Sequence, residues 1–528
     1  MTNIGQKILL AFAGKTRPSE EMLASIRKIR PAGFTLFDHL NDMDSPAEVR
    51  ALTDELQRIA QELNLPPFLI AVDQEGGQLT AIGTGTTPLP GNMALGAVGS
   101  AELAKKAGEV LGCELAAMGI NINYAPVCDV NINPKNPVIG IRSFGEKTEE
   151  VARLSAAMID GIQAQRTYAT AKHFPGHGDT DGDSHHSLTA VSHPVERLRE
   201  VEFPPFHAAI ESDVKLIMTA HIAVPAVDGA AERPATLSPE VLRGLLRDEL
   251  GFKGVIVTDA MNMLAIRQGE FVGEEALRAV NAGADLLLMG GEMDAQERVF
   301  DALKQAELDG KLDDLEVDAS QARIAALRRS LPVAPLDLGR VGSPEHLAVA
   351  QEIAEKSITL VRDDANILPL RLDANERVAL VMPVPVDMTP ADTSSSVKPQ
   401  LGKALRTYHR HVDEFNISHA PQQKDSANLL QRLKSYDLVI VGTMDAYSIP
   451  EQAAFVRAVL ALETKVVVAA LRLPYDLAVF PEVKTYLCTY SIQEPSLAAL
   501  AKVLFGELAA QGSLPVSIPD LYPVGHKK

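Results

Sequence analysis

Residues 251–263 read GFKGVIVTDAMNM, and this stretch carries the pattern that decides the fold. An apolar run, Val255–Thr258, ends directly in an aspartate, Asp259. Continuous apolar runs of this length are typical of strands that are buried on both faces of a parallel sheet. Similar runs recur on both sides of this segment, and longer stretches with helical spacing of apolar residues separate them.

Eight such runs alternate with helical patterns over the first two thirds of the chain. They are Ile8–Ala13, Gly33–Phe37, Phe68–Val72, Ile122–Ala125, Tyr168–Ala171, Leu216–Ala220, Val255–Thr258 and Asp285–Met289. Eight alternating units predict an α/β fold in which the parallel strands close into a (β/α)8 TIM barrel. An open doubly wound sheet is the alternative, and the number of units favours closure.

A proline- and glycine-rich stretch, LPVAPLDLGRVGS at Leu331–Ser343, marks a change in composition. It predicts a barrel domain over residues 1–335 and a smaller C-terminal α/β sandwich over residues 336–528. Five further apolar runs alternate with helical patterns in the second part. Asp387–Gln423 is polar, and we expect it to form an irregular surface segment.

The composition indicates which classes of binding partner are disfavoured. Lys and Arg number 50 and Asp and Glu 69, which gives a net charge of −19. A surface this acidic repels nucleic acid and anionic lipid, so neither is a predicted partner. No apolar run has the roughly 18 residues that a membrane-spanning helix needs, and Ile8–Ala13 is short for the core of a signal peptide. Oligomeric state is not predicted.

The three cysteines, Cys113, Cys128 and Cys488, are far apart in the sequence, and no CxxC motif occurs. This pattern disfavours both a disulfide framework and a zinc knuckle. It fits a reducing compartment, so a cytoplasmic location is predicted.

Polar residues recur where the predicted strands end. They are Asp38, His39, Asp73, Asp129, Lys172, His173, His221 and Asp259. A barrel carries its active site on the face where its strands end, so these positions predict a site there. Asp259 could attack an electrophilic carbon as a nucleophile, or it could cap the following helix.

The segment AKHFPGHGDTDGDSHH, at Ala171–His186, is the richest in titratable groups. DTDGDS resembles a calcium loop, but Gly182 is in the wrong loop position and Ala190 stands where the bidentate glutamate belongs. Its glycines and proline argue against the helical pairing of histidines that is typical of zinc. General acid/base chemistry fits better, because Asp183 could fix the tautomer of His185, two residues away. A polar surface loop remains the alternative.

Two more segments could bind a polar substrate. AVDQEGGQL, at Ala71–Leu79, places Asp73 after a strand, where it could hold hydroxyl groups or cap a helix. The long Asn/Pro-rich loop 121–145 contains Arg142. A guanidinium there could bind hydroxyls or form a structural salt bridge.

Together these segments resemble glycoside hydrolase family 3, specifically its β-N-acetylglucosaminidase branch. The matching strings are DQEGG (Asp73–Gly77), NPKNPVIGIRSFG (Asn133–Gly145), KHFPGHGDT (Lys172–Thr180), DSH (Asp183–His185) and VTDAMNM (Val257–Met263). The resemblance implies a retaining double displacement, with Asp259 as nucleophile and His185 as acid/base, oriented by Asp183. It implies a small carbohydrate substrate and no metal or cofactor. The sugar-binding residues that it implies are Asp73, Arg142, Lys172, His173, His221 and Met263.

One position departs from the family pattern. An arginine usually follows EGG by four residues and binds the far edge of the sugar, and Ala81 stands in its place here. The expected activity is release of terminal β-linked N-acetylhexosamine from glycans or cell-wall fragments, as in peptidoglycan recycling. A β-glucosidase, a phosphorylase on the same barrel and a non-catalytic sugar-binding protein remain the alternatives.

Overall fold

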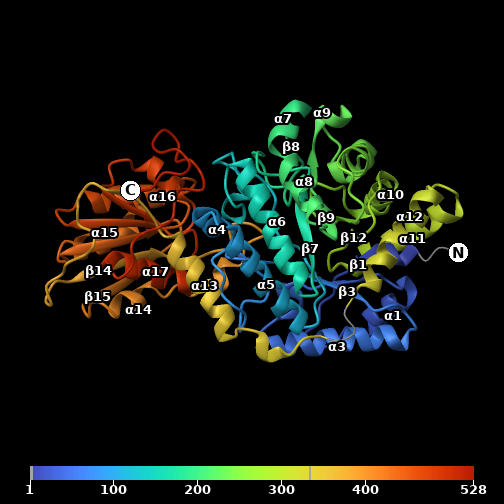
Figure 1. Ribbon diagram of the computed structural model, residues 1–528, viewed down its shortest axis with the longest axis horizontal. Coiled ribbons are helices and arrows are strands. Elements are labelled where there is room, and N and C mark those ends of the chain that lie inside the picture. The colour runs from blue at the N-terminus through green and yellow to red at the C-terminus, as the bar shows by residue number, and fades with distance from the viewer. Residues whose placement is uncertain (1–3, 332–334) are drawn as a thin grey trace.

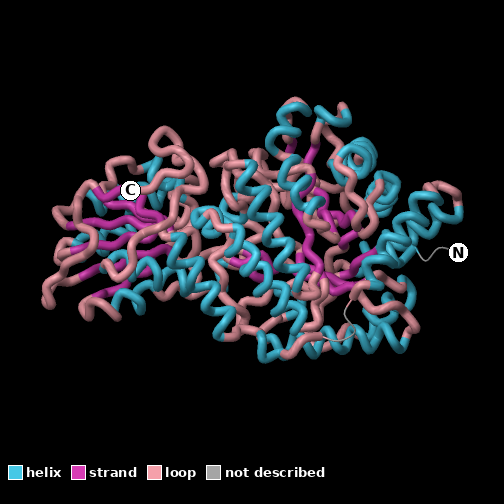
Figure 2. The backbone as a smooth tube through the Cα atoms, viewed as in Figure 1, coloured by secondary structure: helices cyan, strands magenta, loops and turns pink. Residues whose placement is uncertain are grey.

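The computed structural model describes residues 4–331 and 335–528, and most of its strands form two separate sheets (Figures 1 and 2). The larger group is one eight-stranded sheet in the order β11-β9-β7-β6-β3-β2-β1-β12. Its strands are β1 (Ile8–Leu10), β2 (Gly33–Thr35), β3 (Leu69–Val72), β6 (Ile122–Asn123), β7 (Tyr168–Phe174), β9 (Leu216–Thr219), β11 (Val255–Thr258) and β12 (Leu287–Leu288).

The eight-stranded sheet closes into a barrel. Neighbouring strands pair in parallel along the whole order. The two end strands also meet, through a parallel bridge between Val257 and Leu286 and a 2.9 Å bond from the Thr258 N–H to the Leu286 carbonyl. Seven of the eight predicted apolar runs contain one of these strands, and Tyr168–Ala171 covers the first four residues of β7, so the predicted (β/α)8 barrel is confirmed.

Helices surround the barrel and follow its strands in the chain (Figure 1). They include α1 (Glu20–Ile29), α3 (Pro46–Glu62), α5 (Ala101–Ala117), α6 (Thr148–Ala164), α8 (Phe203–Glu211), α10 (Val272–Ala282), α11 (Met293–Leu308), α12 (Asp314–Arg329) and the π-helical η4 (Glu240–Glu249). Helix α3 shows how local sequence fixes an element. The Ser45 side chain accepts from the Glu48 N–H, Pro46 occupies the first turn, and Leu52, Leu56 and Ile59 face the barrel.

The second group of strands is a six-stranded sheet in the order β13-β18-β17-β16-β14-β15. Its strands are β13 (Thr359–Asp363), β14 (Val378–Pro383), β15 (Val412–Ile417), β16 (Leu438–Thr443), β17 (Lys465–Ala470) and β18 (Thr485–Cys488). All pairs are parallel except β13 with β18.

Helices form two contacting groups around this sheet. One group is α13 (Pro344–Ser357), α14 (Leu401–Arg406) and α17 (Glu494–Phe505), and the other is α15 (Gln423–Leu433) and α16 (Pro450–Leu460). Separate apolar clusters pack the two groups against the sheet. The predicted α/β sandwich is therefore confirmed. The predicted boundary after residue 335 lies beside residues 332–334, which are outside the described part of the chain.

The expectation of an irregular surface over Asp387–Gln423 was wrong. This segment contains helix α14, strand β15 and a loop in which Thr389, Ala391 and Asp392 are buried. Strand β15 was missed because it lies at the edge of the sheet and therefore mixes exposed with buried positions. A continuous apolar run is expected only for strands that are covered on both faces.

Candidate active site

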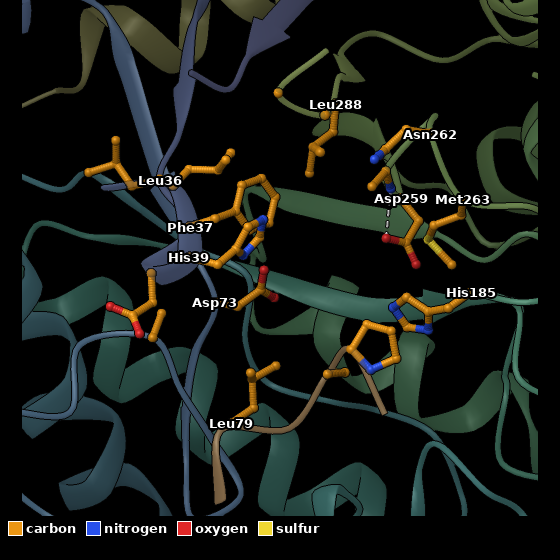
Figure 3. Close-up of a pocket in the computed structure, with 18 of the residues that line it drawn as sticks. Leu36, Phe37, His39, Asp73, Leu79, His185, Asp259, Asn262, Met263 and Leu288 are labelled. Carbon is orange, nitrogen blue, oxygen red and sulfur yellow. Dashed lines mark hydrogen bonds between the residues drawn. The ribbon is translucent and has the colours of Figure 1, made fainter. Parts of the chain in front are cut away.

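A cavity of about 580 Å³ opens where the barrel strands end. Asp73 follows β3, Lys172 and His173 lie near the end of β7, and Asp259 follows β11. His185 lines the same cavity, and Figure 3 shows its ring and the Asp259 carboxylate projecting into one space. A volume of this order is typical of small-molecule binding sites.

Asp259 is fixed at the end of β11 by its own backbone. Its Oδ1 accepts from the Ala260 N–H at 2.7 Å, and its own N–H donates to the Thr219 carbonyl at 3.3 Å. Burial raises the pKa of Asp259, but the nearby His221, His173 and His185 rings and the Ala260 N–H outweigh it. The net pKa lies below that of an ordinary aspartate, so the carboxylate stays ionised and available as a nucleophile.

His185 and Asp183 form a directly bonded pair. His185 Nδ1 lies 2.6 Å from Asp183 Oδ1, and the same oxygen accepts from the His185 backbone N–H at 2.9 Å. Burial raises the pKa of Asp183, but the hydrogen bonds and the charge of His185, together with His186, lower it more, so the carboxylate is ionised. The pair fixes the orientation of the ring, and Nε2 remains to exchange protons with a ligand.

Four buried or partly buried charges, which we call the charged cluster, occupy one side of the cavity. They are Asp73, Glu75, Arg142 and Lys172. Lys172 Nζ lies 2.6 Å from both Asp73 Oδ1 and Glu75 Oε1. Arg142 donates to both Glu75 oxygens, at 3.0 and 2.8 Å. Burial raises the pKa of Glu75, but the two cations lower it to about 2. Each ion is therefore paired, as buried ions must be.

His173 joins this cluster to a second buried carboxylate. Its Nδ1 lies 2.7 Å from Asp129 Oδ2, and its Nε2 lies 3.4 Å from Arg142 Nη2. Burial, followed by the charges of Arg142 and Lys172, holds the pKa of His173 well below its usual value. A neutral ring therefore lies beside a guanidinium, a lysine and a partly exposed aspartate, which gives this side of the cavity a polar wall.

In the described residues no group of three His, Cys, Asp or Glu side chains is arranged to hold a metal ion. The cavity offers one strand-end carboxylate, one carboxylate-bound imidazole and a set of fixed polar groups.

Comparison of the sequence with models of known protein families identifies the family of this chain. The model of the glycosyl hydrolase family 3 N-terminal domain matches residues 3–327. The model of the family's C-terminal domain matches residues 358–523. The chain belongs to glycosyl hydrolase family 3. As a family 3 member it is a glycosidase.

Individual relatives agree with this assignment. The chain is 32% identical to "Beta-hexosaminidase A" of Pseudoalteromonas piscicida, over 98% of this chain and 96% of that one. It is 34% identical to a "Beta-hexosaminidase" of Nitrosomonas eutropha, over 56% of this chain and 84% of that one. Among solved structures it resembles a family 3 β-N-acetylglucosaminidase from Paenibacillus sp. str. FPU-7, with a TM-score of 0.92, 40% identity and 98% of both chains covered.

The family 3 barrel brings most of the residues expected from the sequence to one cavity. Lining it are Asp73, Arg142, Lys172, His173, His185, Asp259 and Met263. Asp183 stands behind His185 as its partner. Arg142 also lines the cavity, but most of its donors are engaged within the protein, by Glu75 and the Val138 carbonyl, so its binding of sugar hydroxyls stays a prediction.

His221 is placed differently from the expectation of direct sugar binding. Its ring is completely buried, with Nδ1 2.8 Å from Thr236 Oγ1 and Nε2 3.1 Å from the Ala260 carbonyl. Both ring nitrogens are therefore engaged within the protein. The ring supports the backbone that carries Asp259 rather than facing the cavity.

The sequence reasoning also missed part of the cavity wall. Pro390, Ala391 and Thr393 line the cavity, although they belong to the loop between β14 and α14 of the C-terminal part. That polar stretch contains no motif that indicates a role at a site built on the distant barrel strands.

Proposed function

We propose that this family 3 glycosidase is a retaining β-N-acetylglucosaminidase that removes terminal, β-linked N-acetylglucosamine. The names of the relatives support the substrate class. The observation that carries the reaction is that Asp259 and the Asp183–His185 pair share one cavity. Separate cavities for these two groups would have excluded any concerted use of them.

In the first half of the reaction, an Asp259 oxygen attacks the anomeric carbon as the glycosidic bond breaks. The Nε2 proton of protonated His185 passes to the leaving oxygen, which departs as an alcohol. In the second half, neutral His185 takes a proton from water through Nε2. The resulting hydroxide equivalent attacks the anomeric carbon, and Asp259 is released as a carboxylate. Asp183 holds Nδ1 throughout.

The charged cluster is proposed to bind the sugar. Asp73 and Lys172 present polar groups to the cavity, and the neutral ring of His173 lines the cavity beside them as a third contact for the sugar. Glu75 and Arg142 position these groups. Met263 gives the ring an apolar contact. Residues 1–335 would form the catalytic domain, and residues 336–528 the second domain.

A cytoplasmic role in recycling cell-wall fragments is part of this proposal. Cys113, Cys128 and Cys488 are buried free thiols, which fits a reducing compartment. None of the described helices combines the length and the apolar character that a membrane span requires.

The test is release of p-nitrophenol from p-nitrophenyl N-acetyl-β-glucosaminide. We expect Asp259→Ala to lower kcat by at least about 10³-fold, because it removes the nucleophile. Asp248→Ala, at an exposed position on η4, is the matched control and should retain full activity. Equal rates for wild type and Asp259→Ala would refute the proposal. Appearance of sugar 1-phosphate in phosphate buffer would instead indicate phosphorolysis.

A further inference from the structure

The loop from Met388 to Ser394 reaches from the C-terminal part into the catalytic cavity. Pro390, Ala391 and Thr393 line the cavity together with Leu79 and Ala81 of the barrel. Ala81 contributes only a methyl group to this side. The C-terminal loop therefore completes the wall of the cavity there. In Figure 3 a tan segment, the colour of this part of the chain, runs beside Leu79.

The barrel holds this loop through Gln78. The Gln78 carbonyl accepts from both the backbone N–H and the hydroxyl of Thr393, each at 3.0 Å. The Gln78 side-chain amide donates to the Ala391 carbonyl at 3.2 Å, and the Thr80 N–H donates to Thr393 Oγ1 at 3.1 Å. Four hydrogen bonds thus fix the loop against the turn after Glu75.

The C-terminal part holds the same loop through Arg472, which follows β17. Its Nη1 lies 3.0 Å from both Asp392 Oδ2 and Ser394 Oγ. Its Nη2 donates to Gln78 Oε1 at 2.7 Å, which crosses between the two parts of the chain. Arg472 is 6% exposed, and Asp445 pairs with its Nε at 3.0 Å. One planar guanidinium therefore ties the loop, the barrel turn and its own sheet together.

The position of Arg472 results from the topology of the sheet. The strand order places β14 between β15 and β16. The chain runs from β14 to β15 on one side, and the next connection crosses back to β16 on the other side, so the strand order reverses at β14. The edge where such parallel strands end is the usual ligand-binding edge of a doubly wound sheet. Asp392, Asp445 and Arg472 follow β14, β16 and β17 at this edge, and the edge meets the barrel at Gln78.

We propose that Arg472 is a positioning residue for catalysis and that the loop Met388–Ser394 is a specificity-determining wall. By holding this wall against Gln78, Arg472 sets the space open to the sugar substituents beside Ala81. The C-terminal domain is thereby part of the substrate-binding site. This inference rests on the proposed N-acetylglucosaminidase activity.

The experiment compares kcat/KM for the p-nitrophenyl N-acetyl-β-glucosaminide and β-glucoside substrates in wild type, Arg472→Ala and Gln78→Ala. The ratio of the two values does not depend on the active fraction, so partial misfolding cannot imitate a change in it. We expect the preference for the N-acetylated sugar to fall about 10-fold in each variant, mostly through KM, because a displaced wall misplaces the ring. The double variant should lose little more than either single variant, since both break the same connection.

Arg377→Ala is the matched control, because Arg377 forms an exposed ion pair with Asp413 at the opposite edge of the same sheet. It should leave the ratio unchanged. Pro390→Phe changes the wall and leaves Arg472 and its partners in place, because Pro390 is exposed and lines the cavity. It should raise KM for the N-acetylated substrate even if Arg472→Ala does not fold.

Calorimetric binding of N-acetylglucosamine separates this inference from the proposed function. Weaker binding by the Gln78 and Pro390 variants than by wild type would support the wall even without turnover. An unchanged ratio and unchanged binding in all three variants would overturn it. Failure of wild type to hydrolyse the N-acetylated substrate would instead count against the proposed function.

Discussion

The charged cluster and the acid/base loop, residues 183–187, lie at the same cavity but are built in different ways. In the cluster, the side chains of Glu75, Arg142 and Lys172 are 2–3% exposed, and each pairs with at least one opposite charge of the same cluster. In the loop, the side chains of His185 and His186 are 23% and 67% exposed. The side proposed to hold the sugar is thus a cross-linked buried network, whereas a few local hydrogen bonds place the proposed proton donor.

This difference separates two kinds of sensitivity. A buried network of ions is stable only while every ion keeps its partner, so removal of one member should damage the fold as well as binding. A loop with few buried contacts adds little to global stability, so its substitutions should alter chemistry and leave the fold intact. Matched substitutions in the two regions can test this separation.

Among variants in these two regions, the largest effect is expected from His185→Ala. Loss of the acid/base group should lower kcat by about 10²- to 10⁴-fold. The loss should be greatest for a disaccharide and smaller for an aryl glycoside with an acidic leaving group, which needs less protonation. The melting temperature should remain close to that of wild type. Steady-state kinetics on both substrates and a thermal melt measure this.

His186→Ala is the matched control for His185→Ala, because the neighbouring ring is exposed and makes only a 3.9 Å approach to Asp183. It should retain activity on both substrates. A large fall in the melting temperature of His185→Ala would break the proposed contrast. An equal loss for both leaving groups would argue against an acid role.

An intermediate effect is expected from Glu75→Gln in the charged cluster. The amide keeps the shape but leaves Arg142 and Lys172 with one anion fewer. The pKa of Glu75 is lowered from 4.5 to about 2 in the folded protein. This corresponds to about 3 kcal/mol of stability above pH 4.5. We therefore expect lower stability in urea and a higher KM at neutral pH.

The stability difference between wild type and Glu75→Gln should depend on pH in a definite direction. A group with a depressed folded pKa stabilises the fold above its unfolded pKa, and the effect disappears as the pH falls through the folded value. The stability difference between wild type and Glu75→Gln should thus shrink from pH 5 to pH 2. Glu55→Gln, in the exposed ion pair with Arg58, should cost less than about 1 kcal/mol. If Glu75→Gln lowered the free energy of unfolding by no more than Glu55→Gln does, the charged cluster would not act as a stabilising network.

The sequence predicted the barrel and most of the cavity for one physical reason. Strands buried on both faces are continuously apolar, and a barrel gathers the residues after its strands at one mouth. Asp73, Lys172, His173 and Asp259 could therefore be placed together from the sequence alone. Their assigned roles stay predictions.

Other parts of the site could not be predicted because they depend on contacts distant in sequence. The bond between Arg472 and Gln78 joins residues 394 positions apart, and no local pattern indicates it. His221 also follows a strand, but the direction of its ring depends on Thr236, which belongs to a later segment. Position at a strand end predicts nearness to the cavity and does not predict which way a side chain points.

The smallest effect is expected where the two regions meet. His177 donates its backbone N–H to Asp129 Oδ1 at 2.7 Å, and its Nε2 lies 3.0 Å from the hydroxyl of Ser184, between Asp183 and His185. Ser184→Ala removes this connection and leaves both regions otherwise intact. One neutral hydrogen bond contributes roughly 1 kcal/mol, so kcat should fall about 5-fold.

KM and the response to leaving-group acidity should stay as in wild type, and Ser187→Ala, at an exposed position of the same loop, should change nothing. If Ser184→Ala instead raised KM as strongly as Glu75→Gln, the loop and the cluster would act as one unit, and the distinction between them would have to be given up.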